Sequence, residues 1–572
     1  MTPNSVFRIR LIAVGVGVVV LFFIVRLYLL QIVSGDDFRQ RAERQYLRPN
    51  QEIYDRGSIF FKDADGTAVG AAILKTGYTL GINPKALDNA PAVWNKLNAI
   101  VPIDQNDFLT RAAQKTQLYS VVAKKLDEAA ATKISELKIP GVLIYKDRYR
   151  YYPFGSLAAN TVGLVGYQGD ILAGRYGLER YYDGTLSRDD SNLYSNLFAE
   201  IFSGIEKTVD SKSKFEGDVV TSIEPTVEAE LEKELASVQK KWNSRLSGGI
   251  IMDPKTGEIF AMGVSPTFDP NNLQNESDPA VFSNPLVENV YEMGSIIKSL
   301  TMAAGIDSGA VTATTTYDDT GFIEVNGSRI ENWDGGLNRG VVDMQVVLNE
   351  SLNTGASFVA QKMGNQLFSD YFRRFGLGED TGIDLPNETP GLIDNLNSPR
   401  DVEHDTASFG QGIAMTPIIT IRALASLANG GYLVTPHLAT RIDYKIGLSK
   451  DIAPERGPQV IKSSTDIEVT RMLVNLVDNA LLNGTVKMAH YSIAAKTGTA
   501  QIADRVNGGY YKDRYLHSFF GYFPAYNPRF IVLLYTVEPK GVGGDFASYT
   551  LTPPFMDIAK FLINYYKIPP DR

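Results

Sequence analysis

The strongest hydrophobic pattern lies near the start of the chain. Every position of residues 11–25 is apolar or glycine, and beyond Arg26 the apolar character continues to Val33. A helix over residues 11–33 can cross the ~30 Å hydrocarbon core of a bilayer, and Arg26 lies past its middle, where it can reach the interface. The stretch is long for a cleaved signal peptide, and no small-x-small cleavage site follows it. We therefore predict an uncleaved transmembrane signal anchor at residues 11–33, after a short cytoplasmic tail at residues 1–10.

The next part of the chain, residues 34–217, mixes strand and helix patterns. Short strand-like segments bounded by turn residues alternate with amphipathic stretches at residues 93–100 and 127–137. No cluster of polar residues here suggests chemistry, and the polar segment at residues 206–217 is typical of a linker. We expect a mixed α/β pedestal that serves as an interaction or dimerisation-like domain.

The remaining residues, 218–572, carry clearer periodicities. Strand patterns predict a hairpin at residues 248–262 and further strands at residues 492–500, 517–523 and 529–536. Helical patterns lie at residues 227–243, 344–352, 357–362, 369–375, 417–428 and 555–566. Strands at both ends of this part with helices between them favour an α+β fold, with one antiparallel sheet flanked by helices and a helical subdomain.

Composition narrows the possible functions. The net charge is −9, and no basic cluster suggests a nucleic-acid partner. The chain has no cysteine, which excludes disulfides, cysteine nucleophiles and thiolate metal sites. The four histidines are dispersed without ligand-like spacing, so we expect no metal site, and a Ser-His-Asp triad has few candidates.

Candidate chemistry begins with a serine and a lysine three residues apart, Ser295 and Lys298. Gly294 precedes the serine and an apolar segment follows it, so we predict a buried helix that starts at or near Ser295. Residues three apart on a helix share one face, which puts the amine beside the hydroxyl. A lysine whose pKa is lowered in an apolar site can take the serine proton, and the amides of the helix start can stabilise an oxyanion. The bare Ser-x-x-Lys pattern is weak, because it also occurs at Ser135, Ser211 and Ser237.

Two further motifs lie downstream. Ser351 and Asn353 form the chain's only Ser-x-Asn, a hydroxyl and a carboxamide that could relay a proton and hold a substrate carbonyl, although the same residues suit the end of a helix. Lys-Thr-Gly occurs three times, and only the copy at Lys496 follows the Ser-x-Asn. Gly498 in an edge strand would let a peptide backbone approach and pair, and the neighbouring hydroxyls and ammonium suit a C-terminal carboxylate.

The three motifs, in this order on a helix start, a helical-domain loop and a strand, resemble the signature of penicillin-recognising serine enzymes. Nearly the whole chain is similar to class B penicillin-binding proteins, which are membrane-anchored, monofunctional peptidoglycan D,D-transpeptidases. Further segments that carry the resemblance are Arg-Gly-Ser-Ile at 56–59, Gly-Leu-Glu at 177–179, Asp-Pro-Lys-Thr-Gly-Glu-Ile at 253–259, Gly-Gln-Gly at 410–412 and Phe-Phe-Gly-Tyr-Phe-Pro-Ala at 519–525. The resemblance implies a pedestal at residues 34–217 and a penicillin-binding transpeptidase domain at residues 218–572.

The resemblance also implies catalytic roles. Ser295 would attack the carbonyl of the penultimate D-Ala of a stem pentapeptide and expel the terminal D-Ala, while Lys298 accepts the serine proton. Ser351 would pass a proton toward the leaving amine, with Asn353 near the substrate amide and Lys496 supporting Ser351 electrostatically. An amine of a neighbouring stem peptide would then take the acyl group and complete the cross-link.

Substrate binding is implied for the strand motif, Lys-Thr-Gly-Thr. Thr497 and Thr499, on either side of Gly498, would bind the substrate carboxylate, and the backbone amides of Ser295 and Thr499 would form the oxyanion hole. A β-lactam would mimic the D-Ala-D-Ala end and leave a long-lived acyl-enzyme. The resemblance implies neither a metal nor an organic cofactor.

The implied partners are stem peptides on lipid-linked glycan strands, β-lactams, a SEDS-family glycosyltransferase and other membrane proteins of the divisome or elongasome. The chain would be a single-pass protein of the cytoplasmic membrane with its bulk outside the cytoplasm. Residues 331–334, Glu-Asn-Trp-Asp, slightly favour a septal over a lateral-wall role.

Two alternatives remain open. One is a serine β-lactamase or β-lactam sensor. A β-lactamase needs a group that deacylates the serine, and none can be nominated, although Glu379 and Asp380 lie between the second and third motifs. The other is a non-catalytic divisome scaffold, against which the intact motif residues argue.

Overall fold

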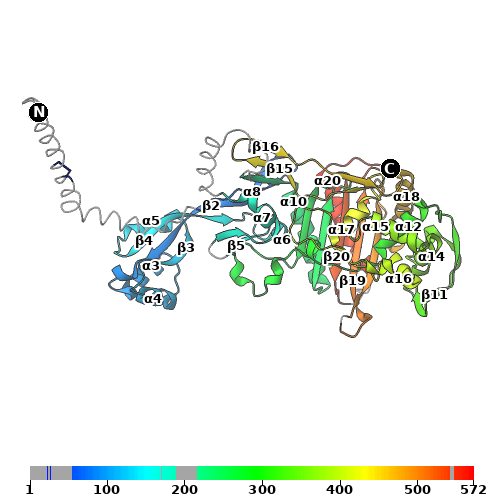
Figure 1. Cartoon of the computed structure of the whole chain (residues 1–572), viewed down its shortest axis with the longest axis horizontal. Helices are drawn as coiled ribbons and strands as arrows, with labels where there is room; N and C mark the ends of the chain where they lie inside the picture. Colours follow the sequence, from blue (N-terminus) through cyan, green and yellow to red (C-terminus); the bar gives the residue numbers. More distant parts are fainter. Residues whose placement is uncertain are drawn as a thin grey trace, which may run out of the picture. The chain divides into compact units, whose positions relative to one another are not determined.

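The computed structural model describes residues 22, 23, 26, 54–168, 171–188, 216–504, 506–541 and 546–572 (Figure 1). The predicted anchor at residues 11–33 lies outside these ranges except for three positions, and most of the predicted linker at residues 206–217 lies outside them as well. Within the described ranges, no helix combines the length and the apolar character needed to span a bilayer. The anchor therefore stays a prediction.

The described chain packs into two compact units. The smaller contains residues 74–149, and the larger contains residues 56–73 together with the described residues from 150 to the end. The expected pedestal therefore contributes to both units. Its predicted boundaries, residues 34–217, stay a prediction.

The smaller unit is built on three strands. β3 (Ser120–Leu126) pairs with the second half of β2 (Ala68–Ile82), and β4 (Val142–Tyr151) also pairs with β2. Leu80, Leu97 and Phe108 are completely buried in its core. A side-chain oxygen of an Asn or Asp accepts a hydrogen bond from the first turn of each of its helices, which fixes where they start. These elements are η2 (Pro84–Ala86), α3 (Ala90–Asn98), α4 (Gln105–Ala113) and α5 (Glu128–Glu136).

A buried ion cluster joins distant segments of the larger unit. Arg56 Nε donates to Glu179 Oε2 over 2.7 Å, and Arg150 Nε donates to Glu179 Oε1 over 2.5 Å. All three side chains are buried, so removal of Glu179 would leave two buried guanidinium groups without the carboxylate that they share. The elements around this cluster are β1 (Ile59–Lys62), α6 (Ala159–Val162), β5 (Val165–Gln168), β6 (Ile171–Gly174), α7 (Gly177–Tyr181) and α8 (Asp183–Leu186).

The central element of the larger unit is a five-stranded antiparallel sheet in the order β18-β19-β20-β8-β9. Its strands are β8 (Leu246–Met252), β9 (Ile259–Ser265), β18 (Ala494–Ala503), β19 (Tyr510–Phe523) and β20 (Phe530–Val537). The predicted hairpin and the three predicted strands are confirmed, as is the α+β class. In the described part of the chain, no strand pairs with the outer edge of β18.

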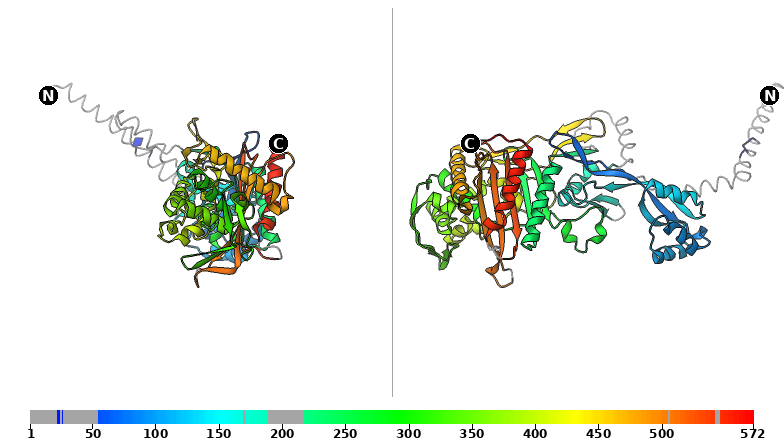
Figure 2. Two further views of the ribbon diagram at one scale, coloured as in Figure 1. Left: turned by 90° about the vertical axis from the view of Figure 1, so that its right-hand side faces the viewer. Right: turned by 180° about the vertical axis from the view of Figure 1, so that it is seen from behind.

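Side chains alternate between the two faces of this sheet, and each face packs against different helices. Phe519 and Phe523 of β19 pack on Phe555 of α20 (Thr552–Tyr565). Tyr522, on the other face, shares a hydrogen bond of 2.8 Å with Thr470 of α18 (Ser463–Asn479). In the rear view of Figure 2, the red α20 lies against the orange strands. The second face is the one that meets the helical subdomain.

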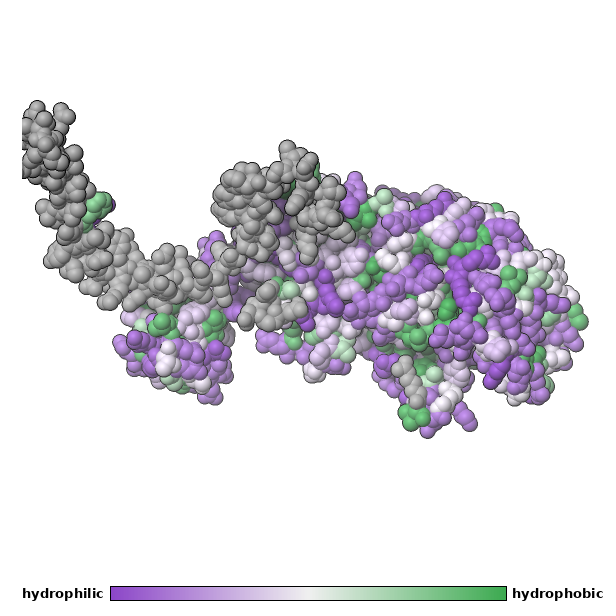
Figure 3. All heavy atoms as spheres, in the orientation of Figure 1, coloured by the Kyte–Doolittle hydropathy of each residue, from purple (hydrophilic) through white to green (hydrophobic). Residues whose placement is uncertain are grey.

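The other elements complete the larger unit, whose drawn surface in Figure 3 is mostly hydrophilic with scattered apolar residues. Its helices are α10 (Pro225–Lys241), α11 (Pro285–Glu288), α12 (Lys298–Asp307), α13 (Met344–Asn349), α14 (Asn353–Met363), α15 (Asn365–Arg374), α16 (Asp401–Ser408), α17 (Pro417–Ala425) and α19 (Ala547–Thr550). The short 3-10 turns are η4 (Leu273–Asn275), η5 (Pro279–Phe282), η6 (Gly294–Ile297), η7 (Asp394–Asn397) and η8 (Leu481–Gly484). The remaining strands are β7 (Gly217–Thr221), β10 (Thr316–Asp319), β11 (Phe322–Val325), β12 (Ser328–Glu331), β13 (Gly340–Asp343), β14 (Tyr432–Val434), β15 (Ala439–Tyr444), β16 (Ser449–Asp451) and β17 (Arg456–Gln459).

The structure differs from the expectations from sequence at three points. Ser295 lies in the 3-10 turn η6, and the α-helix proper begins at Lys298. The helix predicted to reach residue 352 ends at Asn349, because Ser351 adopts a left-handed φ of +55° that no α-helix can continue. α18 was not predicted, although Val469, Leu473 and Val477 give it an apolar face at helical spacing.

Candidate active site

Two glycines bring the serine turn against the edge strand. Gly294 has a φ of +63°, and a Cβ at this position would meet Thr499 O at 2.9 Å. A Cβ on Gly498 would meet Ser518 Oγ at 2.3 Å and Met293 O at 2.7 Å. The backbones of η6 and β18 can therefore approach only because both residues lack a side chain. This contact places Ser295, which is half-buried, beside the strand that carries Lys496.

Lys298 is held by the Ser-x-Asn motif. Its side chain is 1% exposed, and Nζ donates to Ser351 O over 2.6 Å, to Asn353 Oδ1 over 2.7 Å and to Ser351 Oγ over 3.3 Å. In the described structure, no hydrogen bond joins Nζ to Ser295 Oγ. Residues three apart nevertheless share a face in a 3-10 turn, which has three residues per turn. Lys298 directly follows η6, so its side chain and that of Ser295 project in the same direction.

Ser351 lies between two lysines. Its hydroxyl accepts a hydrogen bond of 2.9 Å from Lys496 Nζ in addition to the 3.3 Å contact with Lys298 Nζ. The left-handed backbone of Ser351 turns the chain sharply between α13 and α14, so that its carbonyl and its hydroxyl both face Lys298. One hydroxyl in contact with two amines can exchange a proton with either.

Burial lowers the pKa of both lysines. The pKa of Lys298 lies well below its ordinary value, because its charge is desolvated and because Lys496 is close. Burial lowers the pKa of Lys496 to about 7. Phe409 adds an apolar wall, with its ring centroid 5.9 Å from Lys298 Nζ. A lysine in this site can therefore be neutral near pH 7. Only a neutral amine can accept a proton.

Alternation along β18 separates the strand motif into two faces. Gly498 lies opposite Ser518 in the register, so Lys496 and Gly498 face η6 and the helical subdomain. Thr497 and Thr499 are half-buried and project from the other face. Thr499 Oγ1 accepts a hydrogen bond of 3.2 Å from Ala547 N of α19, which leaves its proton available for an acceptor.

The structure thus brings four of the eight predicted site residues into one hydrogen-bonded cluster: Lys298, Ser351, Asn353 and Lys496. Ser295, Thr497, Gly498 and Thr499 lie beside this cluster through the contact between η6 and β18. The described ranges contain no group of three or more His, Asp or Glu side chains that could hold a metal ion. The expected independence from metals and cofactors stays a prediction.

Three supporting residues were not predicted as part of the site. Ser518 Oγ donates to Met293 O over 2.6 Å and so fixes the turn before the serine. Phe409 lies against Lys298, directly before the Gly-Gln-Gly segment. Asn332 accepts a hydrogen bond of 2.9 Å from Asn353 N. Of the three, only Asn332 lies in a segment that the sequence analysis had singled out, the Glu-Asn-Trp-Asp stretch.

Comparisons with known proteins agree with this architecture. Residues 248–558 match the family model described as penicillin binding protein transpeptidase domain, and residues 54–197 match the penicillin-binding protein dimerisation domain. Stage V sporulation protein D of Bacillus subtilis is 28% identical over 95% of this chain and 84% of its own length. Peptidoglycan D,D-transpeptidase FtsI of Escherichia coli is 26% identical over 96% of this chain and 90% of its own length.

The fold is also found among solved structures. Penicillin Binding Protein 2X from Streptococcus thermophilus superposes with a TM-score of 0.72 and 19% sequence identity, over 90% of this chain and 81% of that chain. The transpeptidase match alone spans more than half of the 572 residues. The chain therefore belongs to the class B penicillin-binding proteins, the D,D-transpeptidases of peptidoglycan synthesis that bind β-lactams.

Proposed function

We propose that Ser295 is the nucleophile of a serine acyl-transfer reaction and that neutral Lys298 is its base. Ser295 Oγ attacks the carbonyl carbon of the penultimate D-Ala of a stem pentapeptide, and its proton moves to Lys298 Nζ. The lowered pKa of Lys298 supports this role, because an amine that is already protonated has no lone pair for the serine proton.

The leaving group needs the proton that Lys298 has taken. As the bond between the carbonyl carbon and the nitrogen of terminal D-Ala breaks, Ser351 Oγ gives its proton to that nitrogen and regains one from Lys298. The contacts of Ser351 Oγ with Lys298 Nζ at 3.3 Å and Lys496 Nζ at 2.9 Å support this relay. An acceptor amine then attacks the ester, its surplus proton returns along the same route, and Ser295 regains its hydroxyl.

Substrate binding would follow the open edge of β18. An extended peptide can pair with an unpaired strand edge through backbone hydrogen bonds. Thr499 Oγ1 already accepts from Ala547 N, so its proton can be donated to a substrate carboxylate, and Thr497 offers a second hydroxyl. The amides of Ser295 and Thr499 are the proposed oxyanion hole.

The observation that supports this proposal most strongly is that the half-buried Ser351 hydroxyl contacts the amines of two buried lysines, Lys298 and Lys496. The test is covalent labelling of membranes with a fluorescent penicillin. Wild type should be labelled stably, Ser295→Ala should not be labelled, and Ser237→Ala, which alters an exposed Ser-x-x-Lys on α10, should label as wild type does. Covalent labelling of the Ser295→Ala variant would refute the nucleophile assignment.

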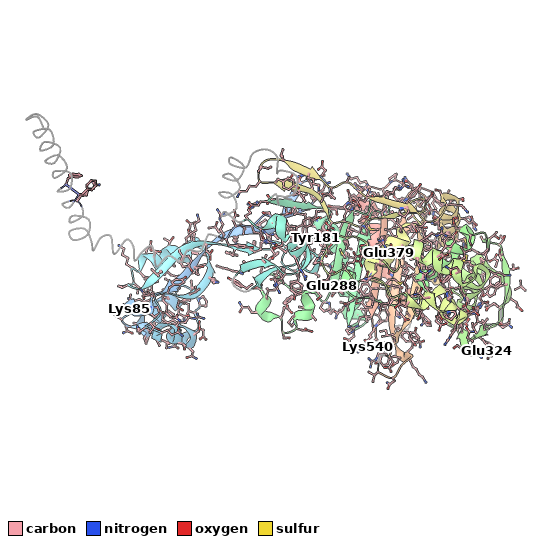
Figure 4. All side chains as sticks on the ribbon, in the orientation of Figure 1. Lys85, Tyr181, Glu288, Glu324, Glu379 and Lys540 are labelled. Atoms are coloured by element: carbon pink, nitrogen blue, oxygen red, sulfur yellow. The ribbon has the colours of Figure 1, made fainter. Side chains whose placement is uncertain are left out.

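The same experiment separates the β-lactamase alternative. Label that is lost within seconds would indicate rapid deacylation. Glu379, labelled in Figure 4, is exposed, and its backbone carbonyl accepts from Arg422. An exposed carboxylate is poorly suited to activate a water in the dry site around Lys298, so we favour the transpeptidase over a β-lactamase or sensor.

At the level of the cell, we propose a single-pass membrane protein with its bulk outside the cytoplasm, anchored by residues 11–33. Its transpeptidase domain, residues 218–572, would cross-link stem peptides of lipid-linked glycan strands beside a SEDS-family glycosyltransferase and other divisome proteins. The proposed role is septal. Depletion of the protein should produce filaments, whereas spherical cells would indicate lateral wall synthesis.

A further inference from the structure

Asn332 is a buried asparagine outside the three motifs. It directly follows β12 and is 3% exposed. A buried amide must find partners for both its oxygen and its nitrogen, since an unsatisfied buried polar group destabilises the fold. Its partners therefore show what the residue holds in place.

The oxygen of Asn332 caps the helix that carries the Ser-x-Asn asparagine. The N-cap residue of α14, Leu352, makes no side-chain capping bond. Asn332 Oδ1 instead accepts hydrogen bonds from Asn353 N at 2.9 Å and Thr354 N at 3.2 Å, the first two amides of α14. A residue 21 positions upstream thus supplies the cap that the helix lacks locally.

The nitrogen of Asn332 fixes the orientation of this amide. Nδ2 donates to both oxygens of Asp319, at 3.0 and 3.2 Å. Asp319 is fully buried and also accepts from Thr354 Oγ1 over 2.9 Å and from Gly321 N over 3.1 Å. In the described part of the chain, the one cation in contact with it is Arg339, whose Nη1 lies 3.4 Å from Asp319 Oδ2. The carboxylate attracts the amide nitrogen, so the amide oxygen must face α14. An aspartate at position 332 would instead set two buried carboxylates against each other, and the nearby Arg339 already pairs with two other carboxylates as well as with Asp319.

Residues close to Asn332 in sequence also form hydrogen bonds with the segment that contains the Ser-x-Asn motif. Trp333 Nε1 donates to Glu350 O over 2.9 Å, and Arg339 Nε donates to Glu350 Oε2 over 2.5 Å. Asn353 Nδ2 donates to Glu331 O over 2.8 Å. Residues 331–339 therefore form hydrogen bonds with Glu350, before Ser351, and with Asn353, after it.

We propose that Asn332, oriented by Asp319, is a positioning residue that sets the Asn353 side chain against Lys298. Asn353 is held at its backbone by Asn332 and at its amide nitrogen by Glu331 O, so its Oδ1 is directed to Lys298 Nζ. The inference rests on the proposed function, because it acts through the proposed base. Substitution of Asn332 should shift the Asn353 side chain relative to Lys298 and so change the proton affinity of Lys298. The pH dependence of the acylation rate should therefore change.

The test compares Asn332→Asp with the swap variant Asp319→Asn/Asn332→Asp. The second-order rate of labelling by fluorescent penicillin is measured for the full chain between about pH 5 and pH 8.5, with melting temperature in parallel. In Asn332→Asp the two carboxylates keep the geometry only while they share a proton. Its rate relative to wild type should therefore fall by about tenfold or more as the pH rises. The swap restores one carboxylate and one amide and should recover most of the loss at high pH.

Asn365→Asp is the matched control. Asn365 Nδ2 also donates to a carboxylate, that of Asp401, over 2.8 Å, but the pair is exposed at the start of α15. This variant should keep the wild-type profile.

A ratio of Asn332→Asp to wild type that is constant with pH, or a folded swap variant no better than the single variant, would overturn the proposal. Failure of both variants to fold would overturn it as well, since the pair would then be a folding requirement. Absence of labelling in wild type would instead refute the proposed function.

Discussion

Asn353 Oδ1 accepts a hydrogen bond of 2.7 Å from the amine of Lys298, 55 residues earlier in the chain. The acceptor is a neutral amide, so it satisfies one donor of the lysine without adding the negative charge that would raise the lysine pKa. The pairing keeps Lys298 fixed and its pKa low at the same time.

Replacement of Asn353 by aspartate tests this relationship. A carboxylate at the same position should stabilise protonated Lys298 and raise its pKa by about 1–3 units. The rise of the penicillin acylation rate with pH should then move to higher pH, because more alkaline conditions are needed to form the neutral amine. Rates measured across the pH range give the profile. Asn349→Asp, on neighbouring α13, is the control, and an unmoved profile in Asn353→Asp would contradict the proposed base.

Replacement of Lys298 by arginine tests proton acceptance. A guanidinium stays protonated at neutral pH, so Lys298→Arg keeps a cation but loses the base. We expect the acylation rate to fall by about 10³-fold or more, within the range of losses known for an activating base. Lys362→Arg, on the exposed end of α14, should label normally. Near-normal labelling of the arginine variant would mean that Lys298 acts only through its charge.

Substitution of Gly498 tests whether the site requires the turn η6 to lie close to β18. The Cβ of alanine would lie 2.3 Å from Ser518 Oγ and 2.7 Å from Met293 O, and the backbone oxygen cannot move without shifting the turn that carries Ser295. We expect Gly498→Ala to lose most penicillin labelling and to melt several degrees lower, in line with a cost of about 1–3 kcal/mol for overpacking.

Gly457→Ala is the matched control for this variant. In β17, the nearest atom to an added Cβ is Leu433 O at 3.3 Å, and the backbone needs no left-handed conformation. The control should label and melt almost as wild type does. A Gly498→Ala variant that is equally undisturbed would show that η6 does not depend on the close approach.

The carboxyl pair Glu228–Glu232 on α10 links pH to stability. Burial raises the pKa of Glu228 well above its ordinary value and raises that of Glu232 from 4.5 to about 7. The folded state therefore binds more protons than the unfolded state in this window. The stability contributed by the pair is complete below the unfolded pKa of 4.5 and is lost as the pH rises through about 7. The loss for Glu232 is of the order of 3 kcal/mol.

Glu228→Gln should remove much of this pH dependence. Glutamine can still accept the hydrogen bond that Met262 N donates to Glu228 Oε2 over 2.7 Å, and its amide nitrogen can donate to Glu232 as a protonated carboxyl does. Thermal unfolding of wild type and variant at about pH 6 and pH 8.5 measures the difference. Glu230→Gln, in an exposed ion pair with Lys233, should leave the wild-type dependence intact.

Much of the catalytic domain could be predicted because its signals are local. β20 is an uninterrupted run of mainly apolar residues, and the second half of β19 is rich in aromatic residues. The glycine and serine of η6 lie close to Lys298 in sequence. The partners of Lys298 could not be derived from periodicity, since Ser351 and Asn353 meet it only through packing between helices. Asn332 was missed for the same reason, because the cap of a helix is normally sought next to its first residue.

The open edge of β18 has a second consequence, for self-association. Among the described residues, no strand pairs with this edge, and such an edge can pair with the edge of another copy and start aggregation. An edge that receives a substrate strand has to stay unpaired, so the protein cannot cover it with a strand of its own. A risk of edge-to-edge association is therefore built into a site that binds an extended peptide.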